Sequence, residues 1–435
     1  MRDLLFTLMF GCAAVPALTR AWLGVLIWTC LDDMNPHRFC YSYACYTIPF
    51  SLIAAVITVI SIVSSSEHLR FTWSREVILL ILFIVWMTIT SLFALNDAVW
   101  IEWDRAIKVQ MLVFATLAAM RTPERIHLLT WMTVVSIGIY GVKGGIWSIM
   151  TGGVSRVRGP QFTFIEDNND IALALVVVLP FMRYLQLRTK NSLVRMGLGV
   201  AQALTALSVI GSYSRAGMIA LGAVILLLVM KSRKKVVFGT FLAASIAAIL
   251  LFMPQQWFDR MHTIETYKDD NSALGRLNAW GFAWNLAKDR PITGGGYRCF
   301  TPKFFRMYAP DPDNYHEAHS IFLKILAEHG FPGLFLFLAL GFCAWRSASW
   351  VRRYARSSEW IWASDWASMF QVSLAGYAVG GAFSNLAYFG LPYHLMIMMV
   401  LCKATLHDAI AEGQDVTNSE PQESIEAVPS LAAAV

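Results

Sequence analysis

Charged residues are scarce in this chain of 435 residues, since Asp, Glu, Lys and Arg make up 15% of it, against roughly a quarter in soluble domains. Hydrophobic residues reach 57% and gather in stretches of about 17 to 25 residues, near the 20 that a helix needs to cross a bilayer. Backbone polar groups find no partners in lipid, so such stretches must form helices. The composition therefore predicts an all-α polytopic membrane protein.

Several common catalytic signatures are also absent. The chain has no G-x-S-x-G nucleophile elbow, no Gly-rich phosphate loop and no H-E-x-x-H, and "HEAH" at 316–319 is one residue too short for that zinc pattern. Its seven cysteines form no paired C-x-x-C; only Cys40 and Cys45 lie close together in one predicted loop, where two free thiols are favoured over a disulfide. We expect neither a metal nor a cofactor. The net charge of +6 is spread over short loops, so nucleic acid is not an expected partner.

Hydropathy predicts about twelve transmembrane helices. They cover roughly residues 4–31, 47–65, 76–94, 106–120, 126–150, 169–187, 194–211, 215–231, 235–253, 319–345, 362–385 and 391–407. This gives four regions, which are helices 1–9 in 1–253, a large loop in 254–318, helices 10–12 in 319–407 and a disordered cytoplasmic tail in 408–435.

The basic residues of the short loops orient the predicted bundle. If each span crosses the membrane in the direction opposite to the one before it, sixteen of these residues fall on one side and about five on the other. The side with more basic residues is expected to be cytoplasmic. Both termini are then cytoplasmic and the 254–318 loop lies on the outer face of the membrane. If the first segment were two short crossings, the N-terminus would change sides. Within the loop, "SALGRLNAWGFAWNLAKD" predicts an amphipathic helix that lies against the bundle or the lipid surface with one face. The residues of this face are Leu274, Leu277, Trp280, Ala283, Trp284 and Ala287.

Arginines at the predicted outer surface are candidates for binding a phosphate. Arg215 stands in "GSYSRAG" where the eighth span begins, Arg276 lies on the loop helix, and Arg156 follows the fifth span. Guanidinium groups bind phosphates bidentately and stay charged near lipid. Contact with lipid phosphate or snorkelling explains Arg215 almost as well, and snorkelling is the favoured explanation for Lys143.

Two polar positions complete the candidate site. Asn168, in "EDNND", fits a helix cap better than a sugar contact, and a sugar contact better than a metal ligand. His319 begins the tenth span at a depth similar to that of Arg215, and an imidazole can accept a proton from a hydroxyl near neutral pH. From chemistry alone, an interfacial histidine bonded to the backbone explains His319 equally well. Further along, Gly330, Pro332 and Gly333 predict a bend.

These motifs together resemble a known family. "HSIFLKILAEHGFPG" fits the pattern of His, then Asn, Ser or Gln, nine residues and G-x-x-G that marks bacterial O-antigen ligases (WaaL) and the wider Wzy-C superfamily. "SYSRAG" resembles the arginine segment of that family, and "GRLNAWGFAWNLAKDRPITGGGY" resembles its G-R-x-x-x-W followed by P-x-x-G-x-G. "DMNPHR", "YGVKGGI" and "EDNN" look more like a branch of O-glycosylation ligases associated with exosortase systems.

The resemblance implies a GT-C-like glycosyltransferase. It would act without metal and with inversion, moving O-antigen from undecaprenyl diphosphate to lipid A-core oligosaccharide in lipopolysaccharide biosynthesis. His319 would be the base, and Arg215 and Arg276 would bind the diphosphate. An O-antigen polymerase or a protein O-oligosaccharyltransferase using the same donor remains an alternative. A polysaccharide or lipid transporter is the alternative outside this class, although transporters place ionisable groups at mid-membrane.

Overall fold

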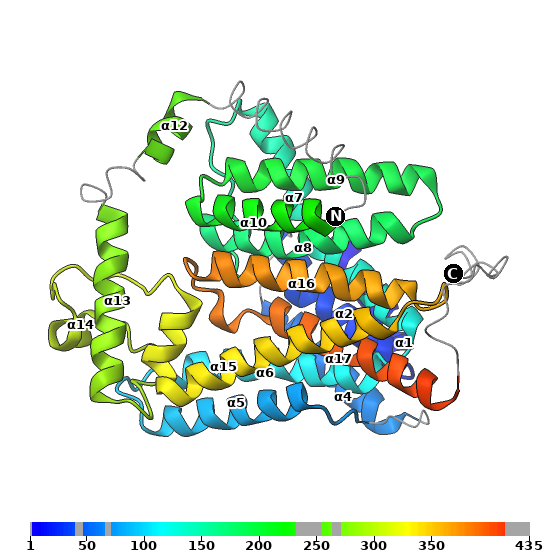
Figure 1. Ribbon diagram of the computed structural model, residues 1–435, viewed down its shortest axis with the longest axis horizontal. Coiled ribbons are helices and arrows are strands. Elements are labelled where there is room, and N and C mark those ends of the chain that lie inside the picture. Colours follow the sequence, from blue (N-terminus) through cyan, green and yellow to red (C-terminus); the bar gives the residue numbers. More distant parts are fainter. Residues whose placement is uncertain (1, 40–46, 66–70, 232–253, 263–270, 414–435) are drawn as a thin grey trace.

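The computed structural model describes residues 2–39, 47–65, 71–231, 254–262 and 271–413, in which the regular elements are all helices. Most helices of the bundle lie side by side (Figure 1). The elements are α1 (Arg2–Ala17), α2 (Ala21–Asp33), η1 (Pro36–Phe39), α4 (Phe50–Ser64), α5 (Arg75–Leu92), α6 (Val99–Ala119), α7 (Pro123–Met150), α8 (Asn168–Arg188), α9 (Ser192–Gly211), α10 (Arg215–Lys231), α12 (Gln255–His262), α13 (Asn271–Asp289), α14 (Pro302–Tyr308), α15 (Ile321–Tyr354), α16 (Ile361–Gly381), η2 (Leu386–Tyr388) and α17 (Gly390–Ala411).

Six segments among the described residues are long and apolar enough to cross a membrane. They are Arg75–Leu92, Pro123–Met150, Asn168–Arg188, Ser192–Gly211, Ile321–Tyr354 and Leu386–Ala411. The side chains on the outside of the bundle support a location in the membrane. Apolar residues such as Phe335 and Phe342 on α15 are more than 60% exposed, as expected of a surface covered by lipid. The class predicted from composition, a helical polytopic membrane protein, is confirmed. The count of twelve stays a prediction, and the ninth predicted span lies outside the described residues.

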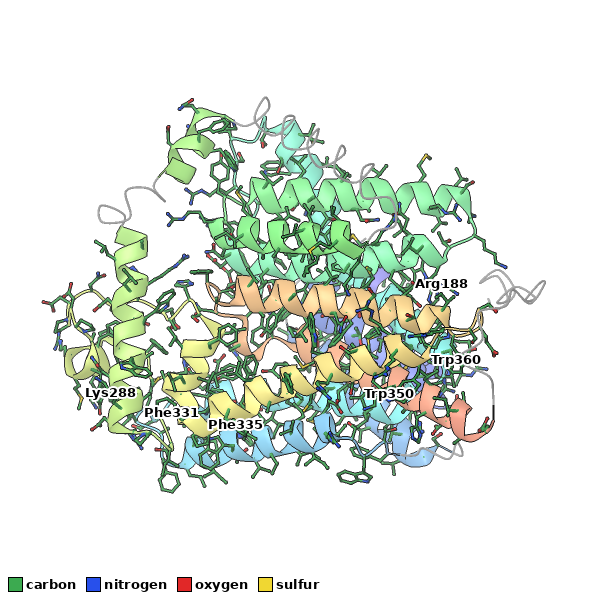
Figure 2. All side chains as sticks on the ribbon, in the orientation of Figure 1. Arg188, Lys288, Phe331, Phe335, Trp350 and Trp360 are labelled. Carbon is green, nitrogen blue, oxygen red and sulfur yellow. The ribbon has the colours of Figure 1, made fainter. Side chains whose placement is uncertain are left out.

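The bundle has two distinct ends. Lys288 and Phe331 lie at the end that carries α13, and Arg188, Trp350 and Trp360 lie at the opposite end (Figure 2). We call these the α13 end and the Arg188 end.

Two of the basic loops predicted for one side, those after α6 and after α8, lie at the Arg188 end. The Arg121 guanidinium is 3.2 Å from the carboxylate of Asp408, and that of Arg188 is 3.8 Å from the carboxylate of Asp365. These pairs join the C-terminal end of α6 to that of α17, and the C-terminal end of α8 to the start of α16. Because α17 is helical to Ala411, it extends into the segment predicted as tail. The rest of that tail, 414–435, lies outside the described residues.

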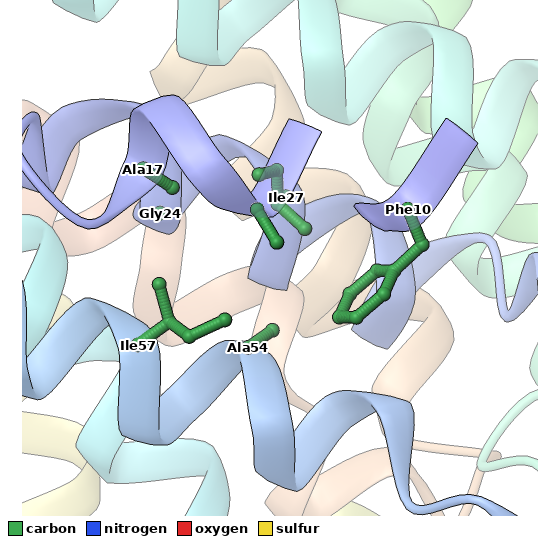
Figure 3. A pocket seen from close by; sticks show the side chains of 7 residues that line it. Phe10, Ala17, Gly24, Ile27, Ala54 and Ile57 are labelled. Atoms are coloured by element: carbon green, nitrogen blue, oxygen red, sulfur yellow. The ribbon is translucent and has the colours of Figure 1, made fainter. Parts of the chain in front are cut away.

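The first predicted span, 4–31, is wrong, because the chain turns back on itself near Arg20 and forms the two helices α1 and α2. Phe6 and Phe10 of α1 pack edge-on against Phe50, with ring centroids 4.9 and 5.1 Å apart, and His37, just after α2, lies 6.4 Å from the same ring. At the other end of α2, the Arg125 guanidinium lies 5.9 Å from the Trp22 ring. An apolar crevice lies where α1, α2 and α4 meet, and Phe10, Ile27 and Ala54 are among the residues that line it (Figure 3).

A sharp kink divides α15 where the sequence predicted a bend. Gly330 has φ 67° and ψ −172°, and the next-but-one residue, Pro332, has no N–H to donate to Glu328. The carbonyls freed by the kink accept hydrogen bonds from outside the helix, at 2.8 Å from the Gly295 N–H to Ala327 and at 2.8 Å from the Gly296 N–H to Glu328. The segment "PITGGG", 291–296, is thereby bonded to α15. Hence the loop and the tenth predicted span form one unit at the α13 end.

Replacing Gly330 with alanine should lower the stability of the protein by about 1 to 3 kcal/mol or more, because only glycine adopts this backbone region readily. An added Cβ would also lie 2.4 Å from the Ile292 carbonyl oxygen. Thermal unfolding in detergent measures the effect. Gly341→Ala on the same helix is the matched control, since its Cβ would meet nothing within 4 Å. Equal melting temperatures for both variants would contradict the role of the kink.

Candidate active site

His319 lies directly before α15 in a strained backbone conformation. Its φ is 41°, in the left-handed region that residues other than glycine rarely adopt. The His319 N–H donates to Oδ1 of Asn385 at 2.9 Å, and Nδ2 of the same carboxamide lies 3.3 Å from ring atom Nδ1. Strain of this kind persists only where surrounding contacts hold it, and it is common at functional sites.

The partner Asn385 is itself held by α8. Asp170, in the first turn of α8, accepts hydrogen bonds through Oδ1 from the Ser384 hydroxyl at 2.6 Å and from the Asn385 N–H at 3.4 Å. Sequence reasoning missed Asn385, because "FSNLAY" is a short polar turn between two apolar spans with no motif of its own. The role of Asn385 depends on contacts between residues that lie far apart in the chain.

The predicted loop helix is α13, and it braces the segment that leads to His319. Asn278 donates through Nδ2 to the carbonyls of Asp311 and Asn314, both at 2.8 Å, and Trp280 donates through Nε1 to the Ala318 carbonyl at 2.9 Å. Gly275 is required here, since an added Cβ would lie 2.5 Å from the His316 ring.

The buried face of α13 matches the predicted one only in part, since Ala283 and Ala287 are fully buried. Phe282 and Leu286 are fully buried against residues that include Phe300 and Phe305, whereas two residues of the predicted face, Leu277 and Trp284, are about half exposed. The later part of the same loop therefore supplies the core on which α13 rests.

Electrostatics at His319 favour a neutral ring. The pKa of His319 is lowered to about 4, mainly by burial and secondly by the positive charge of Arg276, while the negative charge of Asp167 opposes both effects. Arg276 on α13 is therefore close enough to interact with the imidazole. At neutral pH the ring is unprotonated at one nitrogen and can accept a proton.

Arg215 begins α10 at the same end of the bundle. The preceding Ser214 donates to Oδ1 of Asn169 at 2.7 Å, and Asn168 donates through Nδ2 to the Ser212 carbonyl at 2.8 Å. Because Asp170 in the same turn of α8 supports Asn385, the start of α8 links the Arg215 segment to His319.

The weaker candidates have identifiable partners. The guanidinium of Arg156 lies 5.4 Å from the ring of Tyr213, two residues before Arg215, and so Arg156 belongs to the Arg215 neighbourhood. Lys143 lies 5.5 Å from the ring of Phe39, which connects it to η1 and not to His319. Asn168 uses its side chain to join α8 to the end of α9, while Asp167 is the N-cap that accepts from the Asn169 N–H. The segment that holds Cys40 and Cys45 lies outside the described residues.

A buried polar cluster lies about two turns further into α15. His329 contacts the Thr90 hydroxyl through Nδ1 at 2.7 Å and the Tyr388 hydroxyl through Nε2 at 2.8 Å, and Tyr388 donates to Glu328 at 2.6 Å. These bonds join α15 to α5 and η2 beside the kink. Within the described ranges, no three His, Cys, Asp or Glu side chains lie close enough together to hold a metal ion.

The membrane-length apolar helices define the class of the protein, a polytopic membrane protein. An imidazole and arginines form a polar site at one end of its helical bundle. Residues 200–338 match the family described as O-antigen ligase, so this part of the chain is similar to the O-antigen ligase superfamily. That match includes Arg215, Arg276 and His319. Residues 1–191 match a family of unknown function, DUF5935, and this part contains Lys143, Arg156 and Asn168. No curated protein matches the chain.

Proposed function

We propose that the protein transfers O-antigen from undecaprenyl diphosphate to a hydroxyl of lipid A-core oligosaccharide, at the periplasmic face of the bacterial inner membrane. The reaction would be an inverting glycosyl transfer by a GT-C type enzyme, without a metal or another cofactor. The observation that supports this function most strongly is the state of His319. Its imidazole is neutral and half-buried, and it lies within electrostatic range of Arg276 at the α13 end. The O-antigen ligase match over these residues supports the same class of reaction.

In this proposal His319 is the general base. The unprotonated ring nitrogen takes the proton of the acceptor hydroxyl while the hydroxyl oxygen attacks the anomeric carbon of the donor sugar. The bond from that carbon to the diphosphate oxygen breaks, and the diphosphate leaves with the electron pair. Attack from the face opposite the leaving group inverts the anomeric centre.

Arg276 and Arg215 would stabilise the departing diphosphate. The diphosphate of a lipid-linked donor lies at the depth of the lipid headgroups, which is where a polar site at the end of a bundle meets it. Guanidinium groups hold phosphate oxygens in fixed bidentate geometry and remain charged, so they can supply the electrostatic stabilisation that a divalent ion supplies in other enzymes.

A purified transfer assay tests this function. We expect the protein in detergent with EDTA to move glycan from the lipid-linked donor to lipid A-core, and to leave a protein acceptor offered in parallel unmodified. Loss of activity in EDTA would contradict the proposed role of the arginines. A ladder of longer lipid-linked chains from donor alone would instead indicate a polymerase, and glycosylated protein would indicate a protein ligase. Uptake of labelled substrate by sealed vesicles, independent of His319, would indicate a transporter.

A further inference from the structure

Two positively charged side chains meet at one neutral amide at the Arg188 end. Lys231, the last residue of α10, donates through Nζ to Oε1 of Gln371 at 3.1 Å. It also donates to the hydroxyl and the carbonyl of Ser368, at 3.1 and 3.3 Å. Arg352, near the end of α15, donates through Nη1 to the same Oε1 at 2.8 Å. Because both bond to one oxygen atom, the two cationic nitrogens lie within about 6 Å of each other, close enough to repel.

The amide of Gln371 is fixed in this orientation. Gln371 is buried on α16, which lies between α10 and α15 and packs against both (Figure 1). Its Nε2 donates to the hydroxyl of Ser349 at 2.8 Å and to the carbonyl of Trp345 at 3.4 Å, both on α15. The NH₂ group is thus committed to α15, and the oxygen faces the two cations.

No carboxylate balances this pair among the described residues. Neither Lys231 nor Arg352 takes part in an ion pair there. The acidic residue of α16, Asp365, lies 3.8 Å from the guanidinium of Arg188 instead. Neither α10 nor the sequence that follows it, 232–253, contains an acidic residue. Two like charges at this separation destabilise each other unless an opposite charge lies beside them, so the pair favours a bound anion.

Aromatic residues place the pair at the depth of lipid headgroups. Trp350 and Tyr354 flank Arg352 in α15, with ring centroids 4.8 Å apart. Trp350 and Trp360 both lie at this end of the bundle (Figure 2), and tryptophan and tyrosine gather where a membrane meets water. Toward the opposite end, the face of α15 that carries Arg352 continues with exposed apolar side chains, those of Trp345, Phe342, Leu338 and Phe335.

We infer that Lys231 and Arg352 bind the phosphate of an anionic phospholipid, such as phosphatidylglycerol, in the leaflet that borders the Arg188 end. Phosphate oxygens accept charge-assisted hydrogen bonds from both side chains, so the headgroup supplies the missing negative charge. A zwitterionic headgroup fits less well, because its cationic group meets two cations and no carboxylate. The acyl chains then lie along the exposed apolar face of α15. The pair is at the opposite end of the bundle from His319, so this inference does not depend on the proposed function.

Four substitutions that each lower the net charge by one separate this contact from a general attraction to negative lipid. Lys231→Gln and Arg352→Gln each remove one cation, and Gln371→Glu keeps both but pairs them with a carboxylate inside the protein. Arg353→Gln is the matched control, because Arg353 is the exposed neighbour of Arg352 and makes no hydrogen bond or ion pair among the described residues. Since Arg352 is exposed, Arg352→Gln is expected to fold even if Lys231→Gln does not.

The full chain in detergent is titrated with phosphatidylglycerol and, separately, with phosphatidylcholine. Native mass spectrometry measures the affinity for the tightest bound lipid, and thermal unfolding measures its effect on stability. We expect phosphatidylglycerol, and not phosphatidylcholine, to raise the melting temperature of the unchanged protein and the control, because a ligand that binds only the folded state stabilises it. The three variants at the pair should each bind phosphatidylglycerol about 5- to 30-fold more weakly, against less than about twofold for the control.

Three outcomes would overturn the inference. The first is equal affinity for phosphatidylglycerol in the unchanged protein and the three variants. The second is the same loss of affinity in Arg353→Gln, which would show only a general attraction to negative lipid. The third concerns the competing occupant, the C-terminal segment that contains Glu420, Glu423 and Glu426. A carbodiimide cross-link from Lys231 to that segment, retained in excess phosphatidylglycerol, would assign the pair to the tail.

Discussion

Replacing His319 with asparagine should reduce the rate of transfer by about 10²- to 10⁴-fold while the protein stays folded, because general base catalysis contributes about that much. Asparagine is the informative replacement, since it tolerates the left-handed backbone better than most residues and keeps the N–H that bonds to Asn385. In the unchanged protein, activity should rise with pH through about 4 and then level off, because the ring of His319 is neutral above that pH. Initial rates across pH measure both effects.

His407→Ala is the matched control for this loss. His407 is an exposed histidine on α17 near the Arg188 end, and its ring lies 6.4 Å from that of Trp350. We expect this variant to retain the unchanged rate. His319→Asn activity within tenfold of the unchanged protein would show that another group accepts the proton.

Replacing Arg276 with alanine should lower kcat by about 10²- to 10³-fold, the usual effect of removing one group that stabilises charge in a transition state. Arg276→Lys should recover part of the rate, since it restores the charge but not the bidentate geometry. In the alanine variant the acid limb of the pH profile should also shift to higher pH, because the charge of Arg276 lowers the pKa of His319. Steady-state kinetics with lipid-linked donor measure both quantities.

Arg306 in α14 serves as the comparison for Arg276. It is an exposed arginine of the same loop, and Arg306→Ala should leave both the rate and the pH profile unchanged. If Arg276→Ala lowers the rate but leaves the acid limb in place, the electrostatic contact between Arg276 and His319 would be refuted even though the diphosphate role survives.

Much of this arrangement could be predicted from sequence because the relevant patterns are local. The apolar period marks where α8 and α10 begin to within a residue, and "GFPG" marks the kink at Gly330. The excess of basic residues grouped the loops after α6 and after α8 on one side of the predicted bundle, and both lie at the Arg188 end. The grouping of His319 with Arg276 followed from motif spacing, and the charge interaction between them agrees with it.

Other features depend on contacts between distant segments and left no local pattern. Arg20 gives no sign that the chain reverses there, since α1 and α2 are both apolar and only the packing of Phe6 and Phe10 on Phe50 shows their antiparallel arrangement. The buried face of α13 was predicted only in part, because its helical period permits two apolar faces. Phe300 and Phe305, which come later in the chain, decide between them.

The bonds between "PITGGG" and the kink of α15 constrain how the loop could be exchanged between relatives. Gly295 and Gly296 donate to carbonyls of α15, and the Phe331 N–H donates back to Pro291 at 2.9 Å, so neither segment completes its hydrogen bonding alone. A chimera that transplants 254–318 would cut through this interface if its junction fell before Gly330. The exchangeable unit therefore extends from the start of the loop through Gly333, and a graft with that later junction should fold where the shorter one does not.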